Sequence, residues 1–298
     1  YDIAAMWMTS PLFNQMVQND VEVFAGLSNL LVGGDVLSPS HIHRVKKRFP
    51  RLKIINGYGP TENTTFSTTF SIEEEYRENI PIGKPIANSV AYIVDKNGQL
   101  QPIGVPGELY VGGGGVARGY LNNPELTAEK FERIVIRHSS FVIRSLQSSL
   151  KTNDQCPMTN DRLYRTGDLA RWLPDGNIEF LGRMDFQVKI RGFRVEPGEI
   201  EALLLENDEI KEAVVIDGEK KSGGKYLCTY FTAQKKLEVS EVREYLGRQL
   251  PGYMIPSYFT QLEKMPLTPN GKIDRKRLRS ISPGIKTGKH YVAPKSDK

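Results

Sequence analysis

Cysteine is scarce in this sequence: its 298 residues include 2, Cys156 and Cys228. They lie far apart, in no CxxC pair and without the His/Cys spacing of a zinc site, so neither a disulfide framework nor structural zinc is indicated. Apolar runs of membrane-spanning length are also absent, and no signal peptide opens the chain. These absences favour a protein of the reducing cytoplasm that does not enter a membrane.

A strong charge of one sign is missing as well. Lysine and arginine total 40 against 35 aspartate and glutamate, which leaves a net charge of +5. The basic residues gather in 43–48 and in the tail after Lys272, without interleaved aromatic side chains. We interpret them as solvated surface rather than a nucleic-acid-binding face. The composition is otherwise that of a globular protein with about two domains.

Several catalytic signatures are absent too. No serine or cysteine nucleophile has a convincing base, and no HExxH zinc pair occurs. Residues 112–115 are all glycine, but no Lys-Ser or Lys-Thr follows them, as a Walker phosphate loop requires. We therefore interpret these glycines as a site of tight backbone packing.

The hydrophobic pattern of residues 1–184 predicts an α/β domain. Short apolar strands, such as 53–56 and 90–94, alternate with helices that begin at Ser-Pro or Asn-Pro. Within this part, 132–162 shows no cap and no sustained period. We interpret it as a surface insertion, because a long segment of this kind is usually functional or disordered.

A second domain is predicted for residues 185–282. A short hairpin is followed by a helix that begins at Pro197 with apolar side chains on one face, then by two strands and a helix from Ser240. This pattern indicates a small α+β unit of ordinary domain size. Residues 283–298 are interpreted as a linker.

Residues 56–62 bring together groups that suit a nucleotide. Tyr58 follows Gly57 and precedes another glycine, so a face of its ring is open to stack on a flat heterocycle, and Asn56 offers a donor and an acceptor to a base edge. The Thr61 hydroxyl and the Glu62 carboxylate suit a phosphate oxygen and its Mg²⁺ ion, which prefers oxygen ligands. The alternative is a strand-to-turn junction that Thr61 and Glu62 merely cap.

Two further side chains allow the same double interpretation. Asp168 stands just before a strand and could accept both hydroxyls of a ribose, or it could cap a turn. Lys272 follows an Asn-Gly turn with prolines upstream, so a stiff loop presents its ammonium. A compact cation suits an oxyanion or a phosphoryl oxygen, although Lys272 could also be a solvated residue of the basic tail.

The order of these motifs is more specific than any of them alone. It resembles the adenylation domains of non-ribosomal peptide synthetases, within the adenylate-forming (AMP-binding) family that also includes acyl-CoA synthetases and luciferases. The resemblance covers nearly the whole chain except 132–162, and residues 191–196 and 250–256 look more like the peptide-synthetase branch. The motifs are, in order, 56–62, 107–110, 115–120, 164–169, 182–192 and 270–272.

The resemblance implies a fold and a reaction. The expected fold is the later part of a large α/β adenylate-forming subdomain, with mixed sheets and helices, followed by a small α+β lid. The expected reaction joins an amino acid to ATP as an aminoacyl-adenylate and then transfers the acyl group to the phosphopantetheine thiol of a peptidyl carrier domain. The expected partners are that carrier domain and other synthetase modules.

The resemblance also implies roles for single residues. Lys272 would stabilise charge during adenylate formation, Lys189 would act in thioester formation, and Asp185 would be the hinge between the two domains. Glu62 would hold Mg²⁺. The residues implied in nucleotide binding are Asn56, Gly57, Tyr58, Thr61, Asp168, Phe180 and Arg183.

The amino-acid pocket implied by the motifs carries no charge, and its two glycines are expected to leave room. It resembles valine-type pockets, so valine is the first expected substrate and isoleucine or leucine the next. The preference among them is small, since one methylene changes discrimination by only about 1–3 kcal/mol. The lining residues are Trp7 or Met8, Leu31, Gly33, Gly57, Thr65 and Phe66.

One departure from the family pattern matters. The family's phosphate loop and the aspartate that binds the substrate amine belong upstream of Tyr1, so we expect the C-terminal part of such a domain, inactive by itself. Two alternatives stay open: a fragment of an acyl- or aryl-CoA synthetase, and a non-catalytic remnant or interaction module.

Overall fold

The computed structural model describes residues 3–133, 162–190, 192–219, 224–269, 271–281 and 285–286. The chain forms two compact units, Tyr1–Asp185 and Phe186–Lys298, called here the large and the small unit. Most of the predicted insertion and of the predicted linker lies outside the described residues. Among those described, no helix is both long and apolar enough to cross a membrane.

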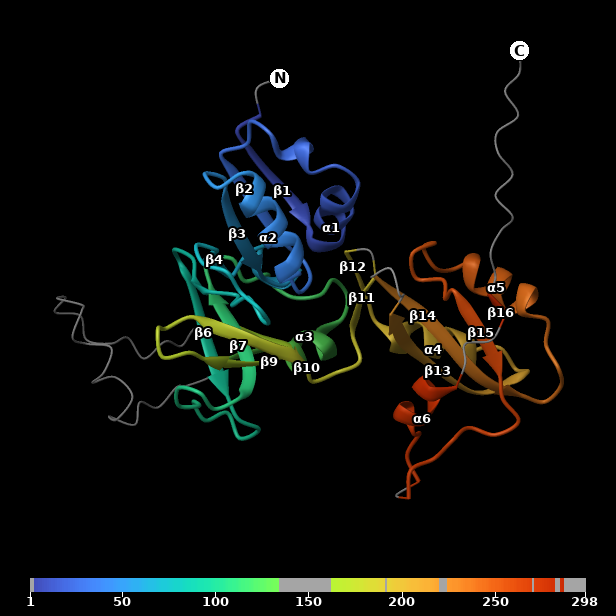
Figure 1. Cartoon of the computed structure of the whole chain (residues 1–298). Coiled ribbons are helices and arrows are strands. Elements are labelled where there is room, and N and C mark those ends of the chain that lie inside the picture. The colour runs from blue at the N-terminus through green and yellow to red at the C-terminus, as the bar shows by residue number, and fades with distance from the viewer. Residues whose placement is uncertain are drawn as a thin grey trace, which may run out of the picture. The chain divides into compact units, whose positions relative to one another are not determined.

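The large unit begins with a five-stranded sheet in the order β1-β2-β3-β4-β5 (Figure 1). The first three strands are parallel, and β4 and β5 continue the sheet in antiparallel pairing. The strands are β1 (Ala5–Thr9), β2 (Asn29–Gly33), β3 (Lys53–Tyr58), β4 (Thr68–Ser71) and β5 (Lys84–Pro85).

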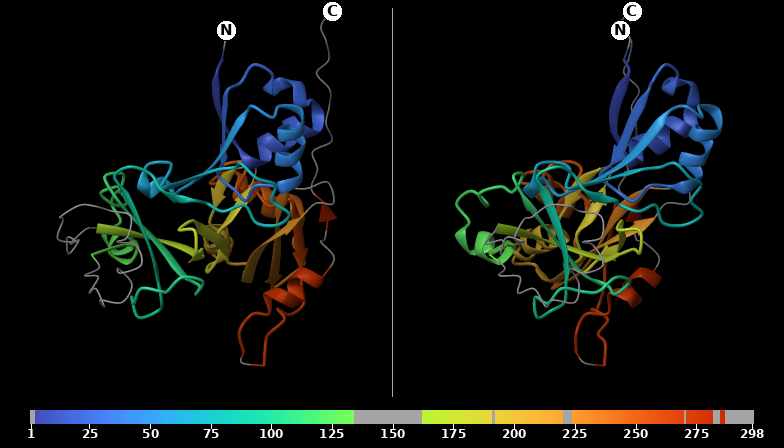
Figure 2. Two further views of the ribbon diagram at one scale, coloured as in Figure 1. Left: turned by 60° about the vertical axis from the view of Figure 1, so that its left-hand side comes forward. Right: turned by 90° about the vertical axis from the view of Figure 1, so that its left-hand side faces the viewer.

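Two helices, α1 (Ser10–Asn19) and α2 (Pro39–Arg48), cover one face of this sheet (Figure 2). Each has a proline in its first turn, where a missing N–H costs no intrahelical hydrogen bond. Their apolar stripes meet alternate residues of the strands. The buried residues of this contact include Phe13, Val17, Ile42 and Val45 of the helices and Leu30, Val32 and Ile54 of the strands.

A second, antiparallel sheet completes the large unit, in the order β10-β9-β7-β6 with β8 beside β9. The predicted hairpin around residues 174–176 is confirmed as β9 and β10. This sheet and its neighbours comprise β6 (Ser89–Val94), β7 (Gly107–Gly113), α3 (Pro124–Lys130), β8 (Phe131–Arg133), β9 (Arg162–Trp172) and β10 (Ile178–Arg183), and two short 3₁₀ helices lie earlier, η1 (Val21–Phe24) and η2 (Thr61–Asn63).

The glycine run at the end of β7 packs tightly, as the sequence predicted. A Cβ on Gly112 would overlap the Leu163 side chain of β9, and one on Gly113 would overlap the carbonyl of Asn88. Gly113 also has a φ of +105°, which a residue with a Cβ rarely adopts. Gly112 and Gly113 therefore allow the segments beside β7 to approach closely.

The small unit has a hairpin followed by a four-stranded sheet in the order β13-β14-β15-β16. Ile285 and Lys286, in the segment interpreted as a linker, form β16 and pair with Phe259 and Tyr258 of β15. The elements are β11 (Val188–Ile190), β12 (Phe193–Val195), α4 (Pro197–Leu205), β13 (Ile210–Glu219), β14 (Lys225–Ala233), α5 (Val239–Gly247), β15 (Tyr258–Gln261), α6 (Arg275–Ser280) and β16 (Ile285–Lys286).

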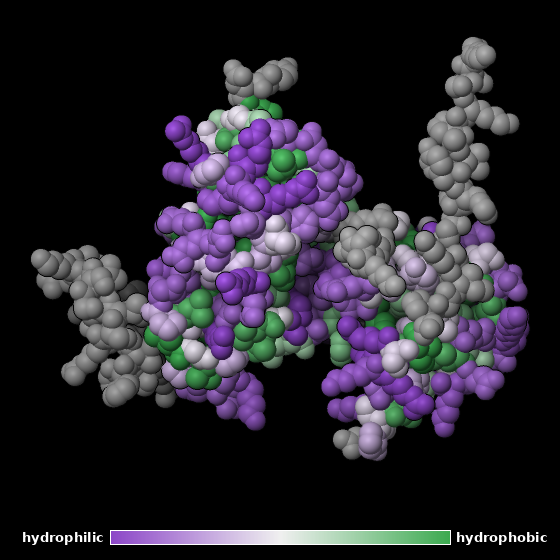
Figure 3. All heavy atoms as spheres, viewed as in Figure 1, coloured by the Kyte–Doolittle hydropathy of each residue, from purple (hydrophilic) through white to green (hydrophobic). Residues whose placement is uncertain are grey.

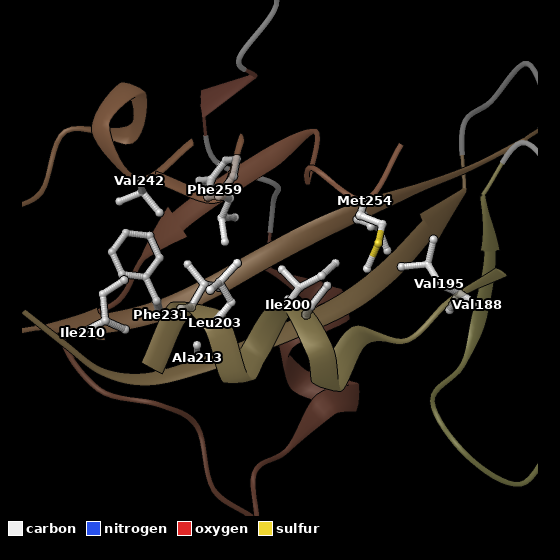
Figure 4. Packing of buried hydrophobic residues seen from close by; sticks show 14 of the residues in the cluster. Val188, Val195, Ile200, Leu203, Ile210, Ala213, Phe231, Val242, Met254 and Phe259 are labelled. Atoms are coloured by element: carbon white, nitrogen blue, oxygen red, sulfur yellow. The ribbon is translucent and has the colours of Figure 1, made fainter. Parts of the chain in front are cut away.

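The main core of the small unit lies between α4, α5 and one face of this sheet. Figure 4 shows Ile200 and Leu203 of α4 pointing into the same layer as Phe231 of β14. On the other face, Leu278 of α6 packs with Val214 and residues of β14. In the view of Figure 3, the surface of the small unit carries both hydrophilic and hydrophobic side chains.

The helices and sheets of the two units confirm the predicted mixed α/β fold class.

Candidate functional site

Tyr58, Asp168 and Arg183 form one hydrogen-bond network at the junction of the two sheets of the large unit. The Tyr58 hydroxyl donates to Oδ2 of Asp168, and Nη1 of Arg183 donates to Oδ1 of the same carboxylate at 2.8 Å. Burial, together with the charge of Asp168, raises the pKa of the Tyr58 phenol well above its ordinary value. The phenol therefore stays protonated and remains a donor.

The backbone around Asp168 is fixed from β7. The Thr166 hydroxyl donates to the carbonyl of Leu109 at 2.6 Å and accepts the backbone N–H of Asp168 at 3.0 Å. Asp168 itself is 6% exposed. A buried carboxylate that accepts a phenol and a guanidinium can exchange these donors for the hydroxyls of a bound sugar.

Two other predicted nucleotide residues lie on the strands next to this network. Asn56 is buried on β3, and its Nδ2 donates to the carbonyl of Pro81 at 2.8 Å. Phe180 of β10 and the ring of Tyr58 are both partly buried and pack against the same apolar cluster. Thr61 is exposed at the first position of η2, directly after Pro60, whose backbone is extended.

Asp185, the last residue of the large unit, is tied back to that unit. Nε of Arg183 donates to its Oδ1 at 2.8 Å, and Nη2 donates to its Oδ2. Gly167, with a φ of +69°, lies next to this ion pair: a Cβ on it would be 2.8 Å from Oδ2 of Asp185 and 3.0 Å from Nη2 of Arg183. Arg183 therefore joins the predicted ribose residue Asp168 to the predicted hinge residue Asp185.

Glu62 is held by two tyrosines that are not among the predicted site residues. Its Oε1 accepts hydrogen bonds from the hydroxyls of Tyr120 at 2.6 Å and Tyr164 at 2.8 Å. Burial and the hydrogen bond to Glu62 raise the pKa of Tyr120 above its ordinary value. Both tyrosines stand within the recognised motifs 115–120 and 164–169, but nothing local in the sequence shows that they converge on Glu62.

The turn after Glu62 is strained and anchored. Thr64 and Thr65 have φ values of +46° and +68°, which cost energy in residues with a Cβ. The Thr64 hydroxyl donates to the carbonyl of Gly115 at 2.7 Å, and the N–H of Ala117 donates to the carbonyl of Glu62 at 2.8 Å. The loop 113–120 thus fixes the position of the Glu62 backbone.

A magnesium ion fits these donors only with ligands from outside the protein. Within the described ranges, no group of three or more His, Cys, Asp or Glu side chains could hold a metal. Mg²⁺, however, typically takes one or two carboxylates and completes its shell with water and substrate phosphates. The buried carboxylate of Glu62 and the exposed hydroxyl of Thr61 match that pattern.

The predicted amino-acid pocket is partly assembled on the sheet face opposite α1 and α2. Trp7 is paired in register with Leu31, and its ring meets that of Phe66 edge to face, with centroids 6.3 Å apart. Trp7 is 50% exposed, whereas Met8 points to the other face and belongs to the buried core. Trp7, and not Met8, therefore shares a face with Leu31.

The expectation that Gly33 and Gly57 leave room needs correction. A Cβ on Gly33 would overlap the carbonyl of Gly57, and a Cβ on Gly57 would lie 2.5 Å from Cε1 of Phe66. The space beside each glycine is therefore already filled. Glycine at these positions lets β2, β3 and the Phe66 ring approach closely.

The two predicted lysines lie on separate elements of the small unit. Lys189 is half-buried on β11, opposite Arg194 of β12. Lys272 is exposed on the loop 267–273 that leads into α6. Figure 1 shows this loop projecting from the small unit, away from β11 and β12.

Comparison with known families and proteins identifies this arrangement. The family model described as AMP-binding enzyme matches residues 1–121 of this chain. The family model described as AMP-binding enzyme C-terminal domain matches residues 199–272. The chain belongs to the AMP-binding enzyme family. Both matched ranges contain predicted site residues of this AMP-binding enzyme: Tyr58 and Glu62 in the first, Lys272 in the second.

Relatives of this AMP-binding chain include large synthetases. Gramicidin S synthase 2 of Brevibacillus brevis is 55% identical over 295 residues, which are 99% of this chain and 6% of that protein. Among solved structures, holo-PA1221, an NRPS protein containing adenylation and PCP domains bound to a vinylsulfonamide inhibitor, is 33% identical with a TM-score of 0.75. That similarity covers 92% of this chain and 44% of PA1221.

A CoA synthetase shares the fold at lower identity. A double mutant of o-succinylbenzoate CoA synthetase (MenE) from Bacillus subtilis has a TM-score of 0.76 but is 20% identical, over 95% of this chain and 52% of that chain. That likeness shows the fold alone. The higher sequence identity of this AMP-binding enzyme is to the peptide-synthetase relatives.

Proposed function

We propose that this chain belongs to an adenylation domain that activates an amino acid with ATP and transfers it to a carrier-protein thiol. The observation that carries the proposal is the 55% identity to Gramicidin S synthase 2 across 99% of the chain. The Tyr58–Asp168–Arg183 network and the tyrosine-held Glu62 support it. The adenylation and PCP domains named for PA1221 support a peptidyl carrier domain and other synthetase modules as partners.

In the first half-reaction, the amino-acid carboxylate would attack the α-phosphorus of ATP, and pyrophosphate would leave. Tyr58 and Phe180 would pack on the adenine, and Asn56 would face its edge. Asp168 would exchange the Tyr58 hydroxyl or the Arg183 guanidinium for ribose hydroxyls. Each of these side chains already lies on a strand of the large unit.

The charged groups of the first half-reaction have separate roles. Thr61 would contact a phosphate oxygen, and Glu62 would hold Mg²⁺. When bound, that ion neutralises phosphate charge and makes pyrophosphate a better leaving group. Lys272 would bring its ammonium to the α-phosphoryl oxygens and stabilise the charge that develops there.

In the second half-reaction, the phosphopantetheine thiolate would attack the acyl carbonyl, and AMP would leave. We assign Lys189 to this step and Asp185 to the hinge about which the small unit turns. The assignment is supported by the position of the two lysines on different elements, β11 and the loop 267–273. One side chain therefore need not serve both steps.

A small branched aliphatic amino acid, valine first, is the proposed substrate. Trp7, Leu31 and Phe66 present apolar surface on one face of the first sheet. The close approach of Phe66 to Gly57 favours a shallow pocket. No lysine, arginine, aspartate or glutamate belongs to the predicted lining, so a charged side chain would be desolvated without a partner.

The test separates the two half-reactions in the full-length protein that contains these residues. Lys272→Ala should suppress amino-acid-dependent pyrophosphate exchange far more than transfer from preformed adenylate to the carrier, and Lys189→Ala and Asp185→Pro should do the reverse. Lys276→Ala, an exposed lysine on α6, is the matched control. The proposal fails if exchange responds to carboxylic acids that lack an amine instead of amino acids.

A further inference from the structure

The loop that carries Lys272 is closed at its base by backbone contacts. Leu267 and Ile273 form an antiparallel bridge, and the Thr268 N–H donates to the Lys272 carbonyl at 2.7 Å. The Lys272 N–H in turn donates to the Thr268 hydroxyl at 3.2 Å. The position of the loop therefore depends on what holds its base to the rest of the small unit.

Arg275, the first residue of α6, provides that anchor. Its Nη2 donates to Oε1 of Glu201 on α4 at 2.9 Å, and its Nη1 donates to the carbonyl of Val215 on β13 at 2.9 Å. Glu201 accepts the N–H of Val215 through the same oxygen at 2.8 Å. The Arg275 and Glu201 side chains are only 23% and 18% exposed, so water screens this ion pair less than a surface pair.

Arg275 also touches the residue that follows the proposed hinge. Its guanidinium carbon lies 4.0 Å from the ring centroid of Phe186, a cation–π contact. Phe186 is the first residue of the small unit and is itself 62% exposed. A single side chain thus joins the base of the Lys272 loop to α4, to β13 and to the start of the small unit.

We propose that Arg275 is a positioning residue for Lys272. By holding the base of the loop against α4, β13 and Phe186, it makes the loop move with the hinge and places the Lys272 ammonium for adenylate formation. The inference rests on the proposed function. Arg275 also differs from the solvated basic residues of the tail, because its guanidinium contacts Glu201, the Val215 carbonyl and the Phe186 ring.

The first test measures both half-reactions of Arg275→Gln in the full-length protein that contains these residues. Misplacing a catalytic group by about 1 Å can cost on the order of a hundredfold in rate, so kcat of pyrophosphate exchange should fall about that much. Transfer from preformed adenylate, assigned to Lys189, should change by no more than about twofold. Arg277→Gln, which removes an exposed charge on the same helix, should leave both rates near those of the unaltered protein.

Two further variants separate positioning from charge and from folding. Arg275→Lys keeps the charge but lacks the planar fork, so it should resemble Arg275→Gln; full recovery of exchange would overturn the inference. Phe186→Leu keeps the ion pair with Glu201 and should slow exchange several-fold more than transfer. If Arg275→Gln does not fold, this variant decides the question alone.

The outcomes also distinguish this inference from the proposed function. If the unaltered protein shows no amino-acid-dependent exchange, the proposed function fails. If it does show exchange, but the Arg275 and Phe186 variants lose both half-reactions in equal proportion or lose neither, Arg275 is a structural residue only and the inference is wrong.

Discussion

Replacing Gly167 by alanine tests how tightly Arg183 and Asp185 are seated in the large unit. Gly167 has a φ of +69°, and a Cβ there would lie 2.8 Å from Oδ2 of Asp185 and 3.0 Å from Nη2 of Arg183. Alanine must therefore adopt an unfavourable backbone conformation and also displace the ion pair. Gly98 is a matched control, because its φ is +74° but nothing lies within 4 Å of its Cβ position.

The two costs can be separated by comparing the variants. The left-handed backbone costs a residue with a Cβ about 1–2 kcal/mol, and this cost applies to both glycines. Displacing Arg183 from the half-exposed Asp185 adds about 1 kcal/mol, at the upper end for a solvent-accessible ion pair. We expect Gly167→Ala to lose about 2–3 kcal/mol of unfolding free energy and Gly98→Ala about 1–2 kcal/mol.

Thermal unfolding followed by circular dichroism measures this difference. For a domain of the size of the large unit, 1 kcal/mol corresponds to about 2–4 °C in Tm. Gly167→Ala should therefore melt about 2–4 °C below Gly98→Ala. Equal Tm values for the two variants would refute the reasoning, because they would show that the ion pair gives way without cost.

Two further predictions concern buried hydroxyl and thiol groups. Tyr120→Phe and Tyr164→Phe should each lower the unfolding free energy by about 1 kcal/mol. The double variant should lose more than the sum of the two single losses, because Glu62 then keeps neither phenol hydrogen bond. Additive losses in urea unfolding would contradict this. Burial raises the pKa of the Cys228 thiol from its ordinary value of 9.0 to about 11. The folded chain therefore holds this proton longer than the unfolded chain, and unfolding free energy should fall between about pH 9 and 11 by up to about 2–3 kcal/mol. Cys228→Ala should flatten that part of the pH profile, and an unchanged slope would contradict the assignment.

Local patterns were sufficient to predict the fold class and many elements. The helix beginning at Pro197 buries Ile200, Leu203 and Leu204, because a 3.6-residue period with proline in the first turn specifies a helix and its buried face. The helix expected from Ser240 begins one residue earlier and ends at Gly247. End positions depend on the last hydrogen bonds more than on the pattern.

Contacts between distant segments were not predicted. The face on which Trp7 or Met8 lies follows from α1 and α2 packing against the first sheet, which a five-residue strand cannot reveal by itself. The parallel pairing of β14 with β15 was missed for the same reason. Single motifs gave the candidate residues, whereas their partners came only from the three-dimensional arrangement.

The hydrogen bonds of Glu62 have a consequence for the order of folding. Tyr120 and Tyr164 stand 58 and 102 residues further along the chain. Contacts of such separation form only after the entropy of closing a long loop has been overcome. The carboxylate therefore reaches its final orientation only when η2, the loop 113–120 and β9 have come together. The geometry of this site is a product of the completed large unit, and no isolated motif can hold it.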